Sequence, residues 1–196
     1  MRVHVVHAHP VETSYNRALF GAVLDSLQGA GHAVDALNLY DEDFPAVMTR
    51  EERLAYHSVP GNLSDLVKPY VERLRAADAV VFVHPVWNYG YPAILKGYFD
   101  RVFLPGVSFT MEGGEDRGRL KPGLHNIRKA AFVTTYGGDR LRTWAMGDPP
   151  RRVAMRWGWA TFRSRPKYLA LYDMNNCTPA RLEGFLATVR AEFTRF

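Results

Sequence analysis

Short apolar runs alternate along the chain with longer segments whose apolar residues recur at helical spacing. The apolar runs predict five strands, at residues 3–6, 32–39, 79–83, 129–135 and 168–172. Helical spacing and capping residues predict helices at residues 14–27, 50–57, 62–76 (with Asn62 or Ser64 as the cap), 92–102 and 178–193. Residues 105–128 are rich in glycine and charge and predict an excursion, whereas residues 139–166 predict no element.

The alternation of strands with helices predicts an α/β fold, in which a parallel sheet is covered by helices on both faces. The chain shows no internal repeat, low-complexity tract or linker, so we expect a single domain over residues 1–196. Ligands bind such sheets at the carboxyl ends of the strands. Unusual polar, aromatic or glycine residues follow three strands, at residues 9–16, 84–91 and 134–138. We therefore predict a ligand site where these strand ends meet.

The composition is that of an ordinary globular protein, with 47% hydrophobic and 23% charged residues. No apolar run reaches the roughly 18 residues of a membrane helix, and residues 1–10 are too polar for a signal peptide. The single cysteine, Cys177, excludes an intrachain disulfide and fits a reducing compartment. We expect a cytoplasmic protein with no membrane insertion and no metal site. No nucleic-acid motif accompanies the net charge of +5, so no nucleic-acid partner is expected.

The first predicted strand leads into a helix start that carries hydroxyl and amide groups. Free backbone N–H groups and the helix dipole favour an anion there, and His9, Thr13, Ser14 and Asn16 add side-chain donors. A flavin phosphate fits this arrangement, although Thr13 or Ser14 caps the helix in any case. The chain has no G-x-G-x-x-G and no Walker lysine here, so neither a dinucleotide fingerprint nor a P-loop is predicted.

The loop after the third predicted strand places Trp87, Tyr89 and Tyr91 around Gly90. A flavin ring needs flat apolar walls and nearby backbone donors, and this loop supplies both. Core packing is the alternative for each aromatic side chain taken singly. The small residues at 134–138 let the backbone approach a ligand closely, and their N–H groups can stabilise negative charge on a reduced ring.

These segments resemble the NAD(P)H:quinone oxidoreductases, which are DT-diaphorase-like flavoproteins. The resemblance rests on His9 with residues 13–16, on the run PAILKGYFDRV at residues 92–102, and on residues 134–138. It implies a flavodoxin-like fold, that is, a doubly wound five-stranded parallel sheet with helices on both faces. It also implies a bound flavin, NAD(P)H as hydride donor, and a homodimer in which the second subunit completes the active site.

The resemblance implies roles for individual residues as well. Contacts to the flavin phosphate are implied for His9, Thr13, Ser14, Tyr15 and Asn16. Contacts to the flavin ring are implied for Pro85, Val86, Trp87, Asn88 and Tyr89, and its polar edge is implied to lie along Thr134, Thr135, Gly137 and Gly138. Three departures leave the catalytic residues open, with Tyr89 and Tyr136 as candidates. Relatives often have Trp in place of Asn88, Tyr136 interrupts the Thr-Thr-Gly-Gly run, and no Tyr and His pair follows the glycines.

The predicted function is the two-electron reduction of quinones or similar acceptors. The alternatives are a flavin reductase for nitro or azo compounds, a flavodoxin-like regulatory subunit of a membrane transporter, and a small electron carrier, which the basic charge disfavours. FAD is favoured over FMN, because the phosphate loop resembles that of FAD-binding relatives and is poor in hydroxyls for a terminal phosphate dianion. The sequence leaves the preference between NADH and NADPH open.

Arginine is concentrated in residues 139–167, where three tryptophans also lie. A solvated basic face is the simpler interpretation. The segment follows the third pocket strand, however, and arginine donates paired hydrogen bonds to phosphate. We therefore predict a lid or pocket wall from which one or two arginines contact the nicotinamide cofactor or an acidic substrate. The candidates are Arg140, Arg142, Arg151 and Arg152.

Overall fold

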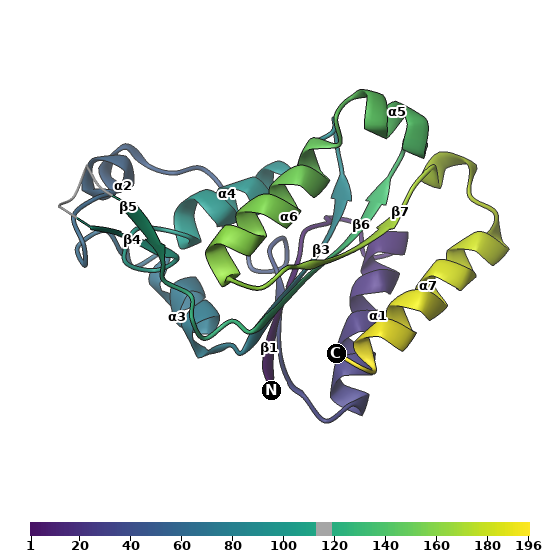
Figure 1. Cartoon of the computed structure of the whole chain (residues 1–196), viewed down its shortest axis with the longest axis horizontal. Coiled ribbons are helices and arrows are strands. Elements are labelled where there is room, and N and C mark those ends of the chain that lie inside the picture. Colours follow the sequence, from purple (N-terminus) through teal and green to yellow (C-terminus); the bar gives the residue numbers. More distant parts are fainter. Residues whose placement is uncertain (113–118) are drawn as a thin grey trace.

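A five-stranded parallel sheet forms the centre of the computed structural model, which describes residues 1–112 and 119–196 (Figure 1). Its strand order is β2-β1-β3-β6-β7. The strands are β1 (Arg2–His7), β2 (Ala33–Asn38), β3 (Ala79–Val86), β6 (Lys129–Tyr136) and β7 (Lys167–Leu171). Each coincides with one of the five predicted strands, and all neighbours pair in parallel. The predicted flavodoxin-like fold is confirmed.

Helices cover both faces of the sheet (Figure 1). On one face, α1 (Tyr15–Gly29) and α7 (Pro179–Phe193) pack against aliphatic side chains of β1, β3 and β6. On the other face, α3 (Lys68–Ala76), α4 (Ala93–Val102) and α6 (Pro149–Phe162) enclose a larger and more aromatic core. None of the helices in the described residues is both long and apolar enough to cross a membrane.

Local signals set most helix boundaries. Ser14 caps α1, because its side chain accepts a hydrogen bond from the Arg17 N–H. Thr178 caps α7 in the same way, and Pro179 follows at a position where proline costs no helical hydrogen bond. The short helix α2 (Arg50–Ala55) begins with a capping box between Thr49 and Glu52.

The structure departs from the predicted elements in three places. Helix α3 begins only at Lys68, because the Asn62 amide instead donates to the carbonyl oxygens of Tyr56 and Pro105. The predicted excursion contains an antiparallel pair, β4 (Phe109–Glu112) with β5 (Arg119–Pro122), and its residues 113–118 lie outside the described chain. Residues 139–166, which predicted no element, form α5 (Arg140–Ala145) and α6. The buried side of α6 is built largely from small residues such as Ala154 and Gly158, so its helical periodicity is weak.

Candidate functional site

The three predicted segments meet at the carboxyl edge of the sheet, in the upper part of Figure 1. Strand β3 lies between β1 and β6, with His7 opposite Val83 and Thr134 opposite His84. The ring of His9 meets that of Trp87 edge-on, with centroids 5.8 Å apart. A Cβ atom added to Gly138 would lie 3.9 Å from the Tyr89 hydroxyl. The first segment therefore touches the second, and the second touches the third.

The start of α1 leaves polar groups without partners. The backbone N–H groups of Tyr15 and Asn16, at the first two helical positions, have no intrahelical acceptor. The Asn16 side chain is only 3% exposed, yet neither its oxygen nor its nitrogen has a hydrogen-bond partner among the described residues. A buried amide without partners is unfavourable. This helix start is therefore suited to a polar or anionic ligand.

Two other residues of this segment are already committed to protein contacts. The His9 ring accepts a hydrogen bond at Nδ1 from the Val11 N–H, 3.1 Å away, and burial lowers the pKa of His9. The Tyr15 hydroxyl donates to the Leu182 carbonyl oxygen of α7 at 2.6 Å, and burial raises the pKa of Tyr15 to about 12. Tyr15 therefore ties α1 to α7 through its side chain, and only its backbone N–H is open to a phosphate. Thr13 is exposed.

Trp87 to Gly90 form a tight turn above β3. The Trp87 N–H donates to the Gly90 carbonyl oxygen at 3.1 Å, and the Gly90 N–H donates to the Trp87 carbonyl oxygen at 2.8 Å. Asn88 and Tyr89, between them, both have positive φ angles, of 49° and 56°. A left-handed conformation is rare for a bulky aromatic residue and marks stored strain, which is common where a backbone is shaped around a ligand. The turn leaves Trp87 42% exposed and Tyr89 half-buried.

The residues on either side of this turn pack differently. Pro85 is buried and Val86 half-buried in the final part of β3. The Tyr91 hydroxyl donates to the Pro150 carbonyl oxygen at 2.8 Å, and its ring contacts His84 and Phe99. Core packing is therefore the role of Tyr91, whereas Trp87 and Tyr89 face the sheet edge.

The end of β6 brings a second unpartnered polar group. Thr134 is fully buried, and its hydroxyl has no hydrogen-bond partner among the described residues. His84, which lies opposite it on the same face of the sheet, has a buried Nε2 atom in the same state. Thr135 is also buried, whereas Gly137 is exposed and Gly138 half-exposed. His84 was not among the predicted site residues, although the repeated His-Pro at two strand ends was a visible signal.

Tyr136 is held away from this edge. It is 1% exposed, and its ring stacks on that of Tyr172. Its hydroxyl donates to Asp148 at 2.7 Å and forms a second hydrogen bond with the Tyr168 hydroxyl. Burial, with Tyr168 and Asp148 beside it, raises the pKa of Tyr136 well above its ordinary value. Tyr136 thus fastens the start of α6 to β6 and β7. Nothing in the sequence near Asp148 indicated this contact.

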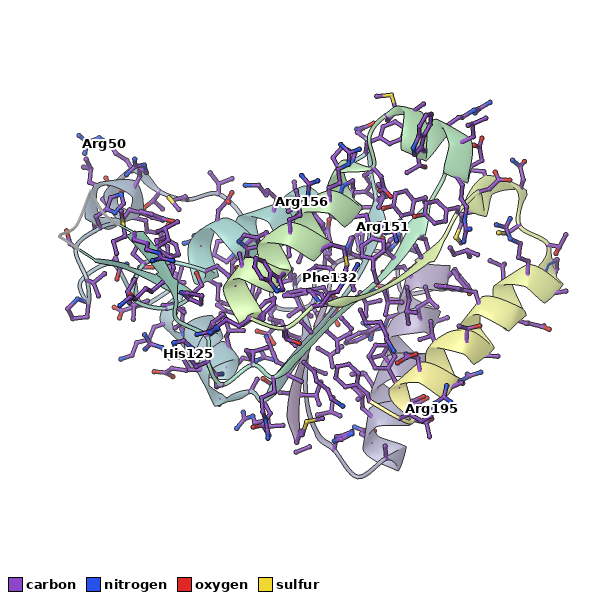
Figure 2. The ribbon with its side chains drawn as sticks, viewed as in Figure 1. Arg50, His125, Phe132, Arg151, Arg156 and Arg195 are labelled. Carbon is purple, nitrogen blue, oxygen red and sulfur yellow. The ribbon has the colours of Figure 1, made fainter. Side chains whose placement is uncertain are left out.

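The arginine-rich segment forms a cavity beside this site. The cavity has a volume of about 510 Å³ and lies between α5, α6 and β7. Arg151 and Arg156, which are labelled at α6 in Figure 2, both line it. Its arginines are Arg140, Arg151, Arg152, Arg156 and Arg165. Arg142, one of the four predicted contacts, does not line the cavity and instead forms an ion pair with Asp139 at 3.3 Å.

Comparison with known proteins gives this arrangement a family. The flavodoxin-like fold family matches residues 1–162. The chain is 33% identical over 157 residues to NAD(P)H dehydrogenase [quinone] 1 of Rattus norvegicus, a match that covers 71% of this chain and 55% of the relative. It is 31% identical over 146 residues to the uncharacterized NAD(P)H oxidoreductase YcaK of Escherichia coli, covering 74% and 69% of the two chains. The chain thus spans little more than half the length of the rat protein.

A solved structure extends the likeness over nearly the whole chain. The NAD(P)H:quinone oxidoreductase of Methanothermobacter marburgensis superposes with a TM-score of 0.85 and 25% identity, and covers 99% of this chain and 98% of its own. The resemblance inferred from the sequence is confirmed. This chain belongs to the flavodoxin-like fold family, and its relatives there are named as NAD(P)H dehydrogenases and NAD(P)H:quinone oxidoreductases.

Proposed function

We propose that this chain is a flavin-dependent NAD(P)H oxidoreductase that reduces quinones or similar two-electron acceptors. The observation that carries the proposal is a pair of buried side chains with unpartnered polar atoms, Asn16 and Thr134, at one sheet edge. The strained turn at Asn88 and Tyr89 flanks the same edge. The names of the relatives, NAD(P)H dehydrogenase [quinone] 1 and NAD(P)H:quinone oxidoreductase, support the reaction class.

In this proposal the protein binds and orients the flavin, which when bound accepts hydride from NAD(P)H and passes two electrons to the acceptor. The backbone N–H groups of Tyr15 and Asn16 hold the phosphate at the positive end of the α1 dipole. Trp87 and Tyr89 form a wall of the ring pocket. The N–H groups of Gly137 and Gly138 lie along its polar edge and stabilise negative charge there. The whole chain, residues 1–196, acts as one cytoplasmic flavin-binding domain.

We propose FAD as the flavin rather than FMN. The terminal phosphate of FMN is a dianion and calls for several donors. The hydroxyl oxygen of Ser14 already accepts from the Arg17 N–H, which leaves Thr13 as the uncommitted hydroxyl of this segment. A titration of the purified protein with FAD and FMN in parallel tests this choice, and tighter binding of FMN would reverse it.

We also propose that two copies of the chain form a dimer and that each completes the other's site. Large apolar side chains around the carboxyl edge are exposed, and such patches commonly mark an interaction surface. They are Val11, Trp87, Leu141, Trp144 and Met146. Sedimentation at micromolar concentration is expected to give the mass of a dimer. A monomer throughout this range would contradict the proposal.

The visible absorption spectrum is the main experiment. The purified protein is expected to show the bands of oxidised flavin, or to acquire them when FAD or FMN is added. Asn16→Ala is expected to weaken flavin binding at least tenfold. The control, Tyr15→Phe, removes only the bond to Leu182 and should lower stability without changing flavin affinity. A protein that binds neither flavin overturns the proposal.

Turnover separates the enzyme from the other functions. Oxidation of NAD(P)H is measured with a benzoquinone, an azo dye and a nitroaromatic compound as acceptors. A preference for the benzoquinone is expected, and a preference for either other acceptor would move the assignment to that class. Flavin binding without any turnover would instead favour a regulatory subunit or an electron carrier. Tyr89→Ala should impair turnover more than folding, and a loss of several kcal/mol in stability would return Tyr89 to the core.

A further inference from the structure

Five arginines line one cavity that the flavin site does not use. Arg140 comes from α5, Arg151, Arg152 and Arg156 come from α6, and Arg165 precedes β7. The cavity volume of about 510 Å³ is in the range of small-molecule sites. Because the guanidinium groups come from three segments that are separate in the sequence, tertiary packing and not a local charge run brings them together.

The described residues balance only a small part of the positive charge in this cavity. None of the five arginines forms an ion pair within residues 1–112 and 119–196. Among the described residues, Asp148 is the one carboxylate that lines the cavity, and its two oxygens accept hydrogen bonds from Tyr136 and Tyr172, at 2.7 and 3.4 Å. Arg140 lies over the Tyr172 ring instead. The guanidinium donors thus face the cavity with their charge available for an anion.

Helix α6 is itself unfavourably charged at this end. Arg151 and Arg152 lie in its first turn, where the helix dipole is positive, and the N-cap Asp148 is the acidic residue at this end against these two arginines. Arg152 and Arg156 are four residues apart on one side of the helix, a spacing at which like charges repel. An anion in the cavity relieves both effects. A solvated basic face would gain nothing from such an arrangement.

The cavity also offers a flat apolar surface and lies next to the flavin edge. Trp144 is 74% exposed, and together with Met155 it forms the apolar part of the lining. An aromatic face of this kind stacks well on a purine ring. Arg140 follows Gly138 by two residues, and Thr143 of α5 lies 3.8 Å from where a Cβ on Gly138 would be. A ligand that extends from the flavin edge therefore reaches this cavity along α5.

We propose that this cavity binds the adenosine 2′,5′-bisphosphate half of NADPH, and so gives the protein a preference for NADPH over NADH. This inference rests on the proposed function, since it assigns the hydride donor of the same site. Arg151 and Arg152 bind the 2′-phosphate, Trp144 stacks on the adenine, and Arg140 lies between this half and the nicotinamide at the flavin edge.

The test is direct binding of nucleotide fragments, which needs neither flavin nor turnover. Isothermal titration with 2′,5′-ADP and with 5′-ADP compares two ligands that have the same number of phosphates in different positions. The protein is expected to bind 2′,5′-ADP about ten- to hundred-fold more tightly, the range of one charge-assisted hydrogen bond. Quenching of tryptophan fluorescence should accompany binding, and Trp144→Ala should remove the quenching and weaken both ligands alike.

Single substitutions locate the phosphate. Arg151→Ala and Arg152→Ala are each expected to lower the affinity for 2′,5′-ADP about tenfold and to reduce the preference over 5′-ADP. Arg142→Ala is the matched control, because Arg142 lies on the neighbouring helix α5, in the same basic segment, but outside the cavity lining. It should bind both nucleotides as the unchanged protein does, at low and at moderate salt.

Three results would overturn the inference. The first is equal affinity for 2′,5′-ADP and 5′-ADP. The second is unchanged binding of 2′,5′-ADP in both arginine variants. The third is competition against 2′,5′-ADP by inorganic pyrophosphate at equal concentration, which would show a general anion cavity. A protein that binds flavin and oxidises NADH, but does not bind 2′,5′-ADP, would contradict this inference and leave the proposed function standing. A protein that binds 2′,5′-ADP but no flavin would defeat the proposed function and leave the nucleotide site standing.

Discussion

The two faces of the central sheet are built from different residues. The face under α1 and α7 is packed mainly with aliphatic side chains, for example Val5, Leu19 and Val81. The face under α3, α4 and α6 packs aromatic rings, including Phe82 and Phe132, whose centroids lie 5.0 Å apart. This second face also buries the guanidinium of Arg101, which is 1% exposed.

The difference extends to the buried polar groups. The aliphatic face is held mainly by packing and by the Tyr15–Leu182 hydrogen bond, and its buried polar side chains are His7 and, at the start of α1, Asn16. On the aromatic face, His84 and Thr134 place polar groups at the carboxyl ends of the strands, and α6 leaves an arginine-lined cavity beside them. A face that must hold polar ligands needs partners for its polar groups, so its stability should depend on particular hydrogen bonds rather than on packing alone. Four measurements test this contrast.

The largest effect is expected at Arg101. Its guanidinium forms an ion pair with Glu52 and also donates to the Pro45 carbonyl oxygen, beneath the aromatic face. Arg101→Met leaves a largely buried carboxylate without its partner and should lower the free energy of unfolding by about 3–5 kcal/mol. Chemical denaturation measures this loss. Lys96→Ala breaks an exposed pair with Asp100 and should cost less than about 0.5 kcal/mol, so equal losses would contradict the contrast.

The Glu52 end of this pair adds a dependence on pH. Burial raises the pKa of Glu52, but hydrogen bonds from Arg101, the Thr49 N–H and Ser64 outweigh it and hold the pKa below its ordinary 4.5. A carboxyl group whose pKa is lower in the folded than in the unfolded protein stabilises the fold at any pH above its unfolded pKa. That stabilisation is lost as the pH falls through the folded pKa. In the double variant Arg101→Met with Glu52→Gln, the pH dependence that Glu52 gives to stability should disappear. Its free energy of unfolding should be higher than that of Arg101→Met alone.

The second effect concerns two of the buried histidines, His7 on the aliphatic face and His84 on the aromatic face. Burial lowers the pKa of His84 and of His7 from 6.5 to about 4. Each is therefore neutral when folded and takes up a proton on unfolding at any pH between these values. The stability that depends on each neutral histidine is therefore complete above pH 6.5 and is lost as the pH falls toward 4. The free energy of unfolding should fall by about 2 kcal/mol per histidine between pH 7 and pH 5.

Denaturation at several pH values checks this dependence. His84→Gln should flatten the profile between pH 5 and pH 7 by about half, whatever its effect on stability at pH 7, because His7 still titrates. The exposed His125 provides a control, and His125→Gln should leave the profile unchanged. An identical profile in His84→Gln would show that His84 is not buried in neutral form.

The third effect is the loss of the Tyr136 hydroxyl. Tyr136→Phe leaves the Tyr168 hydroxyl and one Asp148 oxygen without a partner and should cost about 1–3 kcal/mol. Tyr89→Phe removes a hydroxyl at the edge of the proposed flavin site and should change stability by less than about 0.5 kcal/mol. Turnover distinguishes the two tyrosines as well. If Tyr136→Phe kept full stability but lost turnover, Tyr136 would be a catalytic residue and not a structural one.

The smallest effect has the opposite sign. Removal of a positive charge from the first turn of α6 should relieve repulsion by the helix dipole and by neighbouring arginines. Arg151→Ala and Arg152→Ala are each expected to raise the free energy of unfolding by about 0.3–1 kcal/mol at low ionic strength, and less at high salt. Thermal unfolding in both salts measures the gain. A loss of stability instead would mean that these arginines make structural contacts in the native protein.

Much of the fold was predictable because the signals were local. Strands such as 79–83 and 129–135 stand out as apolar runs, and Ser14 and Thr178 mark helix starts by a hydrogen bond to a residue three positions later. The positions of residues 9–16, 84–91 and 134–138 at one edge followed from the rule that parallel strands end together. Family membership was readable for the same reason, since its motifs are continuous runs at these strand ends.

Only the tertiary structure separated residues that look alike in the sequence. Tyr89 and Tyr136 both lie near glycines at predicted strand ends. The Tyr136 hydroxyl, however, already bonds to Asp148 at the start of α6 and to Tyr168 of β7. Arg142 and Arg140 share one short helix, yet just one of them lines the cavity. Spacing along a chain fixes which side chains share a strand or a helix turn. It does not fix which elements pack together, and the burial, partners and charge balance of a side chain depend on that packing.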